Sequence, residues 1–166
     1  MKCETCSGDL VTIASLKERD IATYLEELSD VVRHTLYISS KQTKKECLES
    51  SKVDVQENGA ICVYAILENK TKKLIGAIEI RPMYQFKGQL YVWLNEQYWG
   101  EGYFKEAIDL ITQMYFENVL ETFCTAHVDV MNVRSYKAFK KAGFADKEIY
   151  DGPYGKQYVL VYKRIS

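Results

Sequence analysis

The apolar residues of the first fifty positions predict a strand followed by two helices. Residues 9–14 alternate in character, which predicts a short strand. Ser15 follows, and Glu18 three residues later gives the spacing of an N-terminal capping box. From Ile21 to Val32, apolar residues recur every three or four positions, so we expect a helix there. A second, more charged helix is expected over residues 41–52.

The middle of the chain has the pattern of strands. Residues 60–67 and 74–81 are apolar segments, and the polar residues 68–73 between them have hairpin length. Residues 89–94 form a further segment of aromatic and aliphatic residues. These three segments are predicted to be neighbouring strands of one sheet.

In the last third of the chain, segments with helical spacing alternate with segments that have a strand pattern. Helical spacing is found in residues 103–117 and 132–142, and strand patterns are found in residues 122–129, 144–150 and 157–164. Gly143 is placed to end the second of these helices. The middle hairpins are antiparallel, whereas the strand–helix–strand crossover requires a parallel pair. We therefore predict an α/β fold with a mixed sheet, built as one domain over residues 1–166.

Composition and charge exclude several classes of protein. The 22 basic and 23 acidic residues give a net charge of -1, so nothing attracts the chain strongly to nucleic acid. The longest apolar run, from Ile61 to Leu67, is far shorter than the roughly 20 residues needed to cross a membrane. The N-terminus lacks the apolar segment of a secretory signal. We expect a cytoplasmic protein with no membrane partner.

The five cysteines do not indicate a metal site. Cys3 and Cys6 form a CxxC pair, but no second pair completes a zinc site, so no metal is expected. An odd number of cysteines in a cytosolic protein favours reduced thiols. Cys124 lies within a predicted strand, where a cysteine is usually a small hydrophobic residue rather than a nucleophile.

Residues 91–103 contain the most informative local pattern. A strand enters a turn with Gly100 and Gly102, and a helix begins directly after it. Such a turn exposes backbone N–H groups at the positive end of the helix dipole, where a pyrophosphate can bind. An ordinary tight turn between strand and helix explains the same letters, so the pattern alone leaves both interpretations open.

A second pattern, further along the chain, adds a family resemblance. The sequence contains, in order, Tyr91-Val92-Trp93-Leu94, Trp99-Gly100-Glu101-Gly102-Tyr103, Glu106-Ala107, and the set Asn132, Ser135, Lys141, Gly143 and Phe144. In these motifs, and in the order of its elements, the chain resembles the GNAT superfamily of N-acetyltransferases. The branch it is most similar to contains the ribosomal-protein and polyamine acetyltransferases. The resemblance extends over nearly the whole chain.

The resemblance implies a fold and a reaction. It implies a mostly antiparallel sheet of about seven strands with about four helices, splayed between the fourth and fifth strands. It also implies acetyl-CoA as co-substrate and transfer of the acetyl group, by direct attack, to a primary amine. That amine would belong to a small molecule, such as a polyamine or an aminoglycoside, or to a protein N-terminus. Family members are often dimers, so a homodimer is one expected state.

By the same resemblance, a set of residues would contact acetyl-CoA. The main chain of Val92 and Leu94 would pair with the pantetheine arm, and Asn132 and Ser135 would bind it with their side chains. The remaining residues expected at the cofactor are Trp99, Gly100, Glu101, Gly102, Tyr103, Phe104 and Phe139. The family usually has a small residue at the position of Phe104.

The acid and the base are less clearly indicated. Phe139 occupies the position of a frequent tyrosine acid, and Gln89 that of a frequent glutamate. The remaining candidates are Glu79, His127 and Asp129, which also have plain structural interpretations: a solvent-facing strand residue, a packed histidine and a turn cap. A non-catalytic CoA-binding or interaction module on the same fold is therefore the alternative to an enzyme.

Overall fold

A computed structural model of the chain describes residues 5–16, 62–81, 88–152 and 155–164. The two helices predicted between Ser15 and residue 52 lie outside the described residues, as does Cys3.

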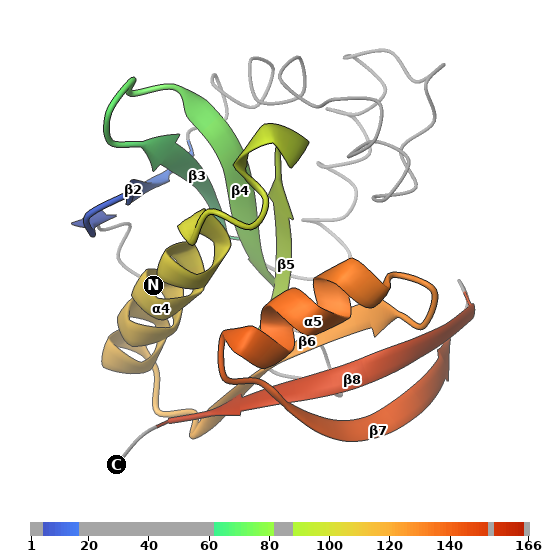
Figure 1. Cartoon of the computed structure of the whole chain (residues 1–166). Helices are drawn as coiled ribbons and strands as arrows, with labels where there is room; N and C mark the ends of the chain where they lie inside the picture. The colour runs from blue at the N-terminus through green and yellow to red at the C-terminus, as the bar shows by residue number, and fades with distance from the viewer. Residues whose placement is uncertain (1–4, 17–61, 82–87, 153–154, 165–166) are drawn as a thin grey trace, which may run out of the picture.

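One eight-stranded sheet runs through the described part of the molecule, in the order β1-β2-β3-β4-β5-β6-β8-β7 (Figure 1). Its strands are β1 (Cys6–Ser7), β2 (Val11–Ser15), β3 (Cys62–Glu68), β4 (Leu74–Arg81), β5 (Gln89–Leu94), β6 (Phe123–Asp129), β7 (Ala145–Gly152) and β8 (Gly155–Lys163). Six of the neighbouring pairs are antiparallel, and the β5–β6 pair is parallel. The predicted mixed, mostly antiparallel sheet is thus confirmed.

The helices of the described part follow the two parallel strands. A 3-10 turn, η2 (Glu96–Tyr98), comes after β5 and leads into α4 (Tyr103–Asn118). Helix α5 (Val133–Lys141) comes after β6. The strands β4 and β5 have the predicted bounds, while β1 is an additional short strand, so the described sheet has eight strands instead of about seven.

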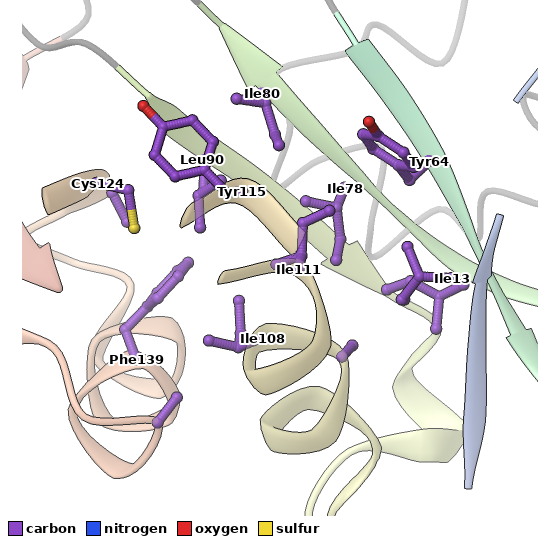
Figure 2. Packing of buried hydrophobic residues seen from close by; sticks show 14 of the residues in the cluster. Ile13, Tyr64, Ile78, Ile80, Leu90, Ile108, Ile111, Tyr115, Cys124 and Phe139 are labelled. Atoms are coloured by element: carbon purple, nitrogen blue, oxygen red, sulfur yellow. The ribbon is translucent and has the colours of Figure 1, made fainter. Parts of the chain in front are cut away.

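The core lies between the sheet and the apolar side of α4. Ile108 and Ile111 of α4 are fully buried and share one cluster with Ile78 of β4 and Leu90 of β5. Figure 2 shows these side chains converging from the helix and the strands. Burying each such side chain contributes about 1.5–3 kcal/mol to the stability of the fold.

Helix α5 covers the same face of the sheet as α4. Phe139 of α5 belongs to the core cluster, together with Cys124 of β6 and Leu90 of β5. Side chains alternate along a strand. The odd-numbered residues of β5 and β6 therefore project from the opposite face of the sheet.

Candidate active site

The sheet opens between β5 and β6. Their parallel pairing is limited to Gln89 with Thr125 and Leu90 with Ala126. Beyond these residues β5 stays paired with β4 as far as Leu94, and β6 stays paired with β8 as far as Asp129. The carboxyl halves of the two strands therefore diverge, as Figure 1 shows, and the predicted splay lies at this position.

The main chain of β5 presents unpaired groups to this opening. The N–H of Asn95 donates to the carbonyl oxygen of Ile75, at 2.8 Å, which turns the main-chain groups of Asn95 towards β4. Main-chain groups alternate in direction along a strand, so those of Val92 and Leu94 point away from β4 and into the splay. An extended ligand arm can pair with them as an added strand would.

The turn after β5 depends on its two glycines. Gly100 and Gly102 have φ angles of 86° and 90°, a conformation that favours glycine. A side chain at Gly100 would meet no atom within 4 Å, so the space beside this main chain is open. Gly102 is the N-cap of α4, and no side chain caps the helix there.

The start of α4 consequently leaves backbone donors for a ligand. The N–H of Glu106 makes the bond to the Gly102 carbonyl oxygen, at 3.1 Å, that begins the helix. The N–H groups of Tyr103, Phe104 and Lys105 have no acceptor among the described residues, as expected for a first turn. These donors, together with the open glycine turn and the helix dipole, fit a pyrophosphate group.

Trp99 and Tyr103 hold the turn in place. The indole N–H of Trp99 donates to the carbonyl oxygen of Leu94 at 2.7 Å, and the guanidinium carbon of Arg134 lies 3.3 Å from the Trp99 ring centroid. Arg134 belongs to α5, so this contact connects the two sides of the opening. We call these sides the β5 arm (β4, β5 and α4) and the β6 arm (β6, β8 and α5). The Tyr103 hydroxyl donates to Glu68 at 3.0 Å, and this hydrogen bond raises the pKa of Tyr103.

The start of α5 is built differently. Asn132 is the N-cap, and its side-chain oxygen accepts the N–H of Ser135 at 3.1 Å. The side-chain NH₂ of Asn132 and the hydroxyl of Ser135 have no hydrogen-bond partner among the described residues. The two side chains predicted to contact the pantetheine arm therefore still have hydrogen-bond donors available for a ligand.

Phe139 lies in the interface between the two helices. Its side chain is 3% exposed and makes edge-to-face contacts with Phe104, at 5.1 Å between ring centroids, and with Phe144, at 5.0 Å. This pairing explains the large residue at Phe104, since its ring fills the space against Phe139. Phe139 therefore supports the first turn of α4, directly after the glycine turn, through its contact with Phe104.

The opposite face of the sheet contains the polar candidates of the β5 arm. Glu79 on β4 accepts a hydrogen bond from Arg81 at 2.8 Å and stands opposite Tyr91 in register. The Arg81 guanidinium lies 4.4 Å from the centroid of the Tyr91 ring. Gln89 is 1% exposed and donates to the Tyr91 hydroxyl at 2.9 Å. Glu79 therefore lies one strand away from the opening, on β4, with its side chain held by Arg81.

His127 stands on the other arm, on the same face as Thr125. Its ring centroid lies 5.9 Å from that of Tyr150. Burial lowers its pKa below 6.5, partly offset by a hydrogen bond with Gln157, so the imidazole is neutral at pH 7. A neutral imidazole can accept a proton.

Asp129 closes β6 and caps the turn that follows. Its side-chain oxygen accepts the N–H of Met131 at 2.8 Å, and its main-chain oxygen accepts the N–H of Asn132, also at 2.8 Å. Its carboxylate is thus engaged in holding the start of α5.

The comparisons with known proteins agree with this geometry. The model of the acetyltransferase (GNAT) domain family matches residues 11–145. The chain belongs to the GNAT acetyltransferase family. The predicted enzyme class, an acetyl-CoA-dependent N-acetyltransferase, is confirmed. No curated protein matches the sequence of this GNAT protein.

Several solved structures share the fold at low sequence identity. An aminoglycoside acetyltransferase, AAC(6')-Ib, in complex with coenzyme A is 19% identical with a TM-score of 0.79, over 93% of this chain and 95% of that one. The spermidine N-acetyltransferase of Vibrio cholerae, with CoA and spermine, is 14% identical with a TM-score of 0.73, over 94% and 96%. The ribosomal-protein-S5-alanine acetyltransferase of Vibrio fischeri is 14% identical with a TM-score of 0.73, over 96% of each chain. At these identities the likeness shows the fold of the GNAT protein.

The sequence analysis did not reveal the role of Glu106 in this GNAT domain. The carboxylate of Glu106 accepts the N–H groups of Asp9, Leu10 and Val11, at 2.9, 2.7 and 2.7 Å. It fixes the N-terminal segment to the first turn of α4. Leu10 lies beside the glycine turn, since a side-chain carbon at Gly102 would come within 3.4 Å of it. The Glu106-Ala107 pair belongs to the motif, but the motif does not reveal these partners.

Cys124 is unsuited to act as a nucleophile in this GNAT domain. Its side chain is fully buried, and burial raises the pKa of its thiol to about 12. The reactive form of cysteine is the thiolate, which is scarce at neutral pH with such a pKa.

The described residues contain no cluster of three or more histidine, cysteine, aspartate or glutamate side chains that could hold a metal ion. No helix among them is long and apolar enough to cross a membrane.

Proposed function

We propose that this GNAT protein transfers the acetyl group of acetyl-CoA to a primary amine by direct attack within a ternary complex. The acceptor classes are a small-molecule amine of the polyamine or aminoglycoside type and a protein N-terminus. The observation that carries the proposal is the splay between β5 and β6, which ends at the uncapped N-terminus of α4. Acetyl-CoA supplies the activated acetyl group as a thioester.

The β5 arm is proposed to bind the cofactor through its main chain. Val92 offers its N–H and C=O groups, and Leu94 its N–H group, to the amides of the pantetheine arm, while the Leu94 carbonyl oxygen already accepts the Trp99 indole N–H. The turn from Trp99 through Gly100, Glu101, Gly102 and Tyr103 to Phe104 offers N–H groups to the pyrophosphate. Because the binding groups are main-chain atoms, the unusual Phe104 is compatible with this role.

The β6 arm is proposed to position the cofactor with side chains. The NH₂ of Asn132 and the hydroxyl of Ser135 are the donors left over after the N-cap of α5 has formed. Phe139 acts indirectly, because its ring supports Phe104 in the turn. The two arms would thus hold the pantetheine between main-chain and side-chain groups.

A base is needed because an alkyl ammonium has a pKa of about 10 and must lose a proton before it attacks. Glu79 lies on β4, beyond β5, and His127 lies on β6, which borders the opening; both are on the face away from α4 and α5. We propose that Glu79, which accepts a hydrogen bond from Arg81, removes the proton, directly or through a water. His127 is the second candidate, and Asp129 is the weakest because it caps a turn.

The alternative, a CoA-binding module without catalysis, has two observations in its favour. Phe139 is buried and has no hydroxyl with which to protonate the leaving thiolate. Gln89 is buried and hydrogen-bonded to Tyr91, so it provides no base at that position. The test of activity therefore also decides between these two functions.

The test is an acetylation assay with a panel of amines. Purified protein is incubated with acetyl-CoA and spermidine, kanamycin or peptides with free N-termini, and the products are identified by mass spectrometry. We expect one acceptor class to gain an acetyl group in proportion to enzyme. Binding of acetyl-CoA without any product over the whole panel would favour the module.

The base is tested with the matched pair Glu79→Gln and Glu117→Gln. Glu117 is an exposed glutamate on α4, far along the helix from the glycine turn. We expect Glu79→Gln to lower kcat by about 10²–10⁴-fold with little change in the affinity for acetyl-CoA, because general-base catalysis has this magnitude. Glu117→Gln should behave as the wild type. Equal rates for both variants would transfer the role to His127.

A further inference from the structure

The carboxylate of Glu106 binds one short segment of the main chain. Residues 8–11, which join β1 to β2, form this segment. One carboxylate oxygen accepts the N–H groups of Leu10 and Val11, both at 2.7 Å, and the other accepts the N–H of Asp9 at 2.9 Å. Hydrogen bonds to a charged acceptor are roughly twice as strong as those between neutral groups. Glu106 therefore attaches this segment firmly to the first turn of α4.

Asn69 binds the carbonyl oxygens of the same segment. Its side-chain NH₂ donates to Gly8 at 2.8 Å and to Asp9 at 3.1 Å, and its main-chain N–H donates to Leu10 at 2.9 Å. Asn69 directly follows β3, so the segment is held between the end of β3 and the start of α4. Because both its N–H groups and its carbonyl groups are bound, the segment has a fixed conformation.

The glycine at position 8 allows Glu106 to come this close. A side-chain carbon at Gly8 would lie 2.6 Å from the carboxyl carbon of Glu106 and 2.9 Å from each of its oxygens. Any other residue there would push the carboxylate away from the N–H groups that it binds. The segment is thus shaped to receive this carboxylate.

The held segment places Leu10 beside the glycine turn. A side-chain carbon at Gly102 would lie 3.4 Å from the Leu10 side chain, and Gly102 has a φ angle of 90°. Leu10 therefore borders the residue at which α4 begins, and it limits the room in which the turn can shift.

The carboxylate also leaves the first N–H groups of its own helix open. A glutamate near the start of a helix can bond back to a free N–H of that helix. Both oxygens of Glu106 instead bind residues 9–11, and the N–H groups of Tyr103, Phe104 and Lys105 have no acceptor in the described part of the chain. Glu106 thus orders the turn without occupying the donors that an anion would use.

We propose that Glu106 is a positioning residue for acetyl-CoA. By holding residues 9–11 it keeps Leu10 against Gly102, and it thereby fixes the turn whose N–H groups would receive the pyrophosphate. The inference rests on the proposed function, because it takes acetyl-CoA as the ligand. Its consequence is that Glu106 determines the affinity for acetyl-CoA through Leu10, without contacting the ligand itself.

The test is a double-mutant cycle on Glu106→Gln and Leu10→Ala, with the affinity for acetyl-CoA measured by calorimetric titration. Glutamine keeps the size of the side chain, but it loses the charge, and its NH₂ group cannot accept an N–H. We expect Glu106→Gln to weaken acetyl-CoA binding by about tenfold, because the turn is no longer held in its binding geometry. Leu10→Ala should weaken it severalfold. The double variant should bind no more weakly than Glu106→Gln alone, since both substitutions release the same contact.

Two controls on α4 separate positioning from a general loss of stability. Glu117→Gln removes the same charge at an exposed position, and Phe116→Leu replaces a buried ring near the other end of the helix. Phe116→Leu should lower the Tm, as Glu106→Gln should, yet both controls should bind acetyl-CoA as the wild type does. At saturating acetyl-CoA, the kcat of Glu106→Gln should stay within about twofold of the wild type, while its KM for acetyl-CoA rises.

Wild-type affinity in Glu106→Gln would overturn the inference, and so would an equal loss in Phe116→Leu or additive losses in the double variant. Circular dichroism verifies that each variant is folded. If Glu106→Gln does not fold, wild-type affinity in Leu10→Ala alone would overturn the inference. In all these cases the proposed function stands, because the wild type still binds acetyl-CoA. Failure of the wild type to bind acetyl-CoA would overturn both.

Discussion

The two arms of the splay begin their helices in opposite ways. On the β5 arm, α4 starts at Gly102 with no side-chain cap, so its first N–H groups remain open. On the β6 arm, α5 starts at Asn132, whose side chain accepts the N–H of Ser135. A side chain that caps a helix occupies the donors that an anion would use.

This difference assigns different tasks to the two arms. Glycines at positive φ let the main chain of the β5 arm approach a ligand closely, and the dipole of a 16-residue helix lies behind it. On the β6 arm, Asn132 occupies one N–H of the first turn of α5, and the side chains of Asn132 and Ser135 offer further donors. A substitution in one arm is therefore expected to disturb that arm while leaving the other intact.

The largest effect is expected from Gly102→Val. A β-branched residue at a φ of 90° is strained, and its side chain would also approach Leu10. The turn would have to rearrange, so the N–H groups of α4 would no longer converge. We expect acetyl-CoA affinity to fall by about a hundredfold, or about 2.7 kcal/mol, measured by calorimetry.

Gly100→Ala is the comparison for this variant. Gly100 has a similar φ of 86°, but a methyl group there meets no atom within 4 Å. It should therefore bind acetyl-CoA with a smaller loss, caused only by backbone strain of about 1 kcal/mol. Wild-type affinity in Gly102→Val, with the domain folded, would mean that the pyrophosphate binds elsewhere.

Some features of the two arms could be predicted from the sequence and others could not. The difference is whether a feature follows from a local pattern or from contacts between residues far apart in the sequence. Strands β4 and β5 could be placed from their local runs of apolar residues, and the glycine turn from its motif. The short strand β1 has no period of its own, and it is positioned by its pairing with β2, where Cys6 stands opposite Ile13. Glu106 holds the adjacent segment through N–H groups more than 90 positions away in sequence, and no local pattern reveals such contacts.

The candidate site, too, could be predicted only in part from local sequence patterns. Phe139 stands in a motif position, yet the structure buries it because its partner Phe104 comes from another helix. Likewise, sequence spacing gives no reason to expect Arg134 on the ring of Trp99. Main-chain binding groups could be predicted from glycine positions, whereas contacts between side chains of different elements depended on the tertiary fold.

A smaller effect is expected from Asn132→Ala on the β6 arm. Removing the N-cap should lower the free energy of unfolding by about 1 kcal/mol, read from thermal or urea denaturation. Acetyl-CoA affinity should fall only severalfold, because the anion site on α4 remains.

Asn132→Ser separates the two roles of this residue. Serine restores the cap with its hydroxyl but lacks the NH₂ group. Stability should return to near the wild-type value while affinity stays reduced, if the NH₂ contacts the pantetheine arm. Full recovery of both would limit Asn132 to capping α5.

The smallest effect is expected from the pH dependence of stability in His127→Asn, also on the β6 arm. Burial lowers the pKa of His127 below 6.5 in the folded state, so the unfolded chain binds its proton more readily. The wild type should therefore lose stability as the pH falls from about 6.5 towards the folded-state pKa, and this loss should be absent in the variant. Thermal melts between about pH 5 and 8 should show a difference in Tm of the order of 1 °C at the acid end and a constant offset above pH 7. Parallel curves over the whole range would show that the imidazole is as well solvated in the fold as in the unfolded chain, which would weaken His127 as the second candidate for the base.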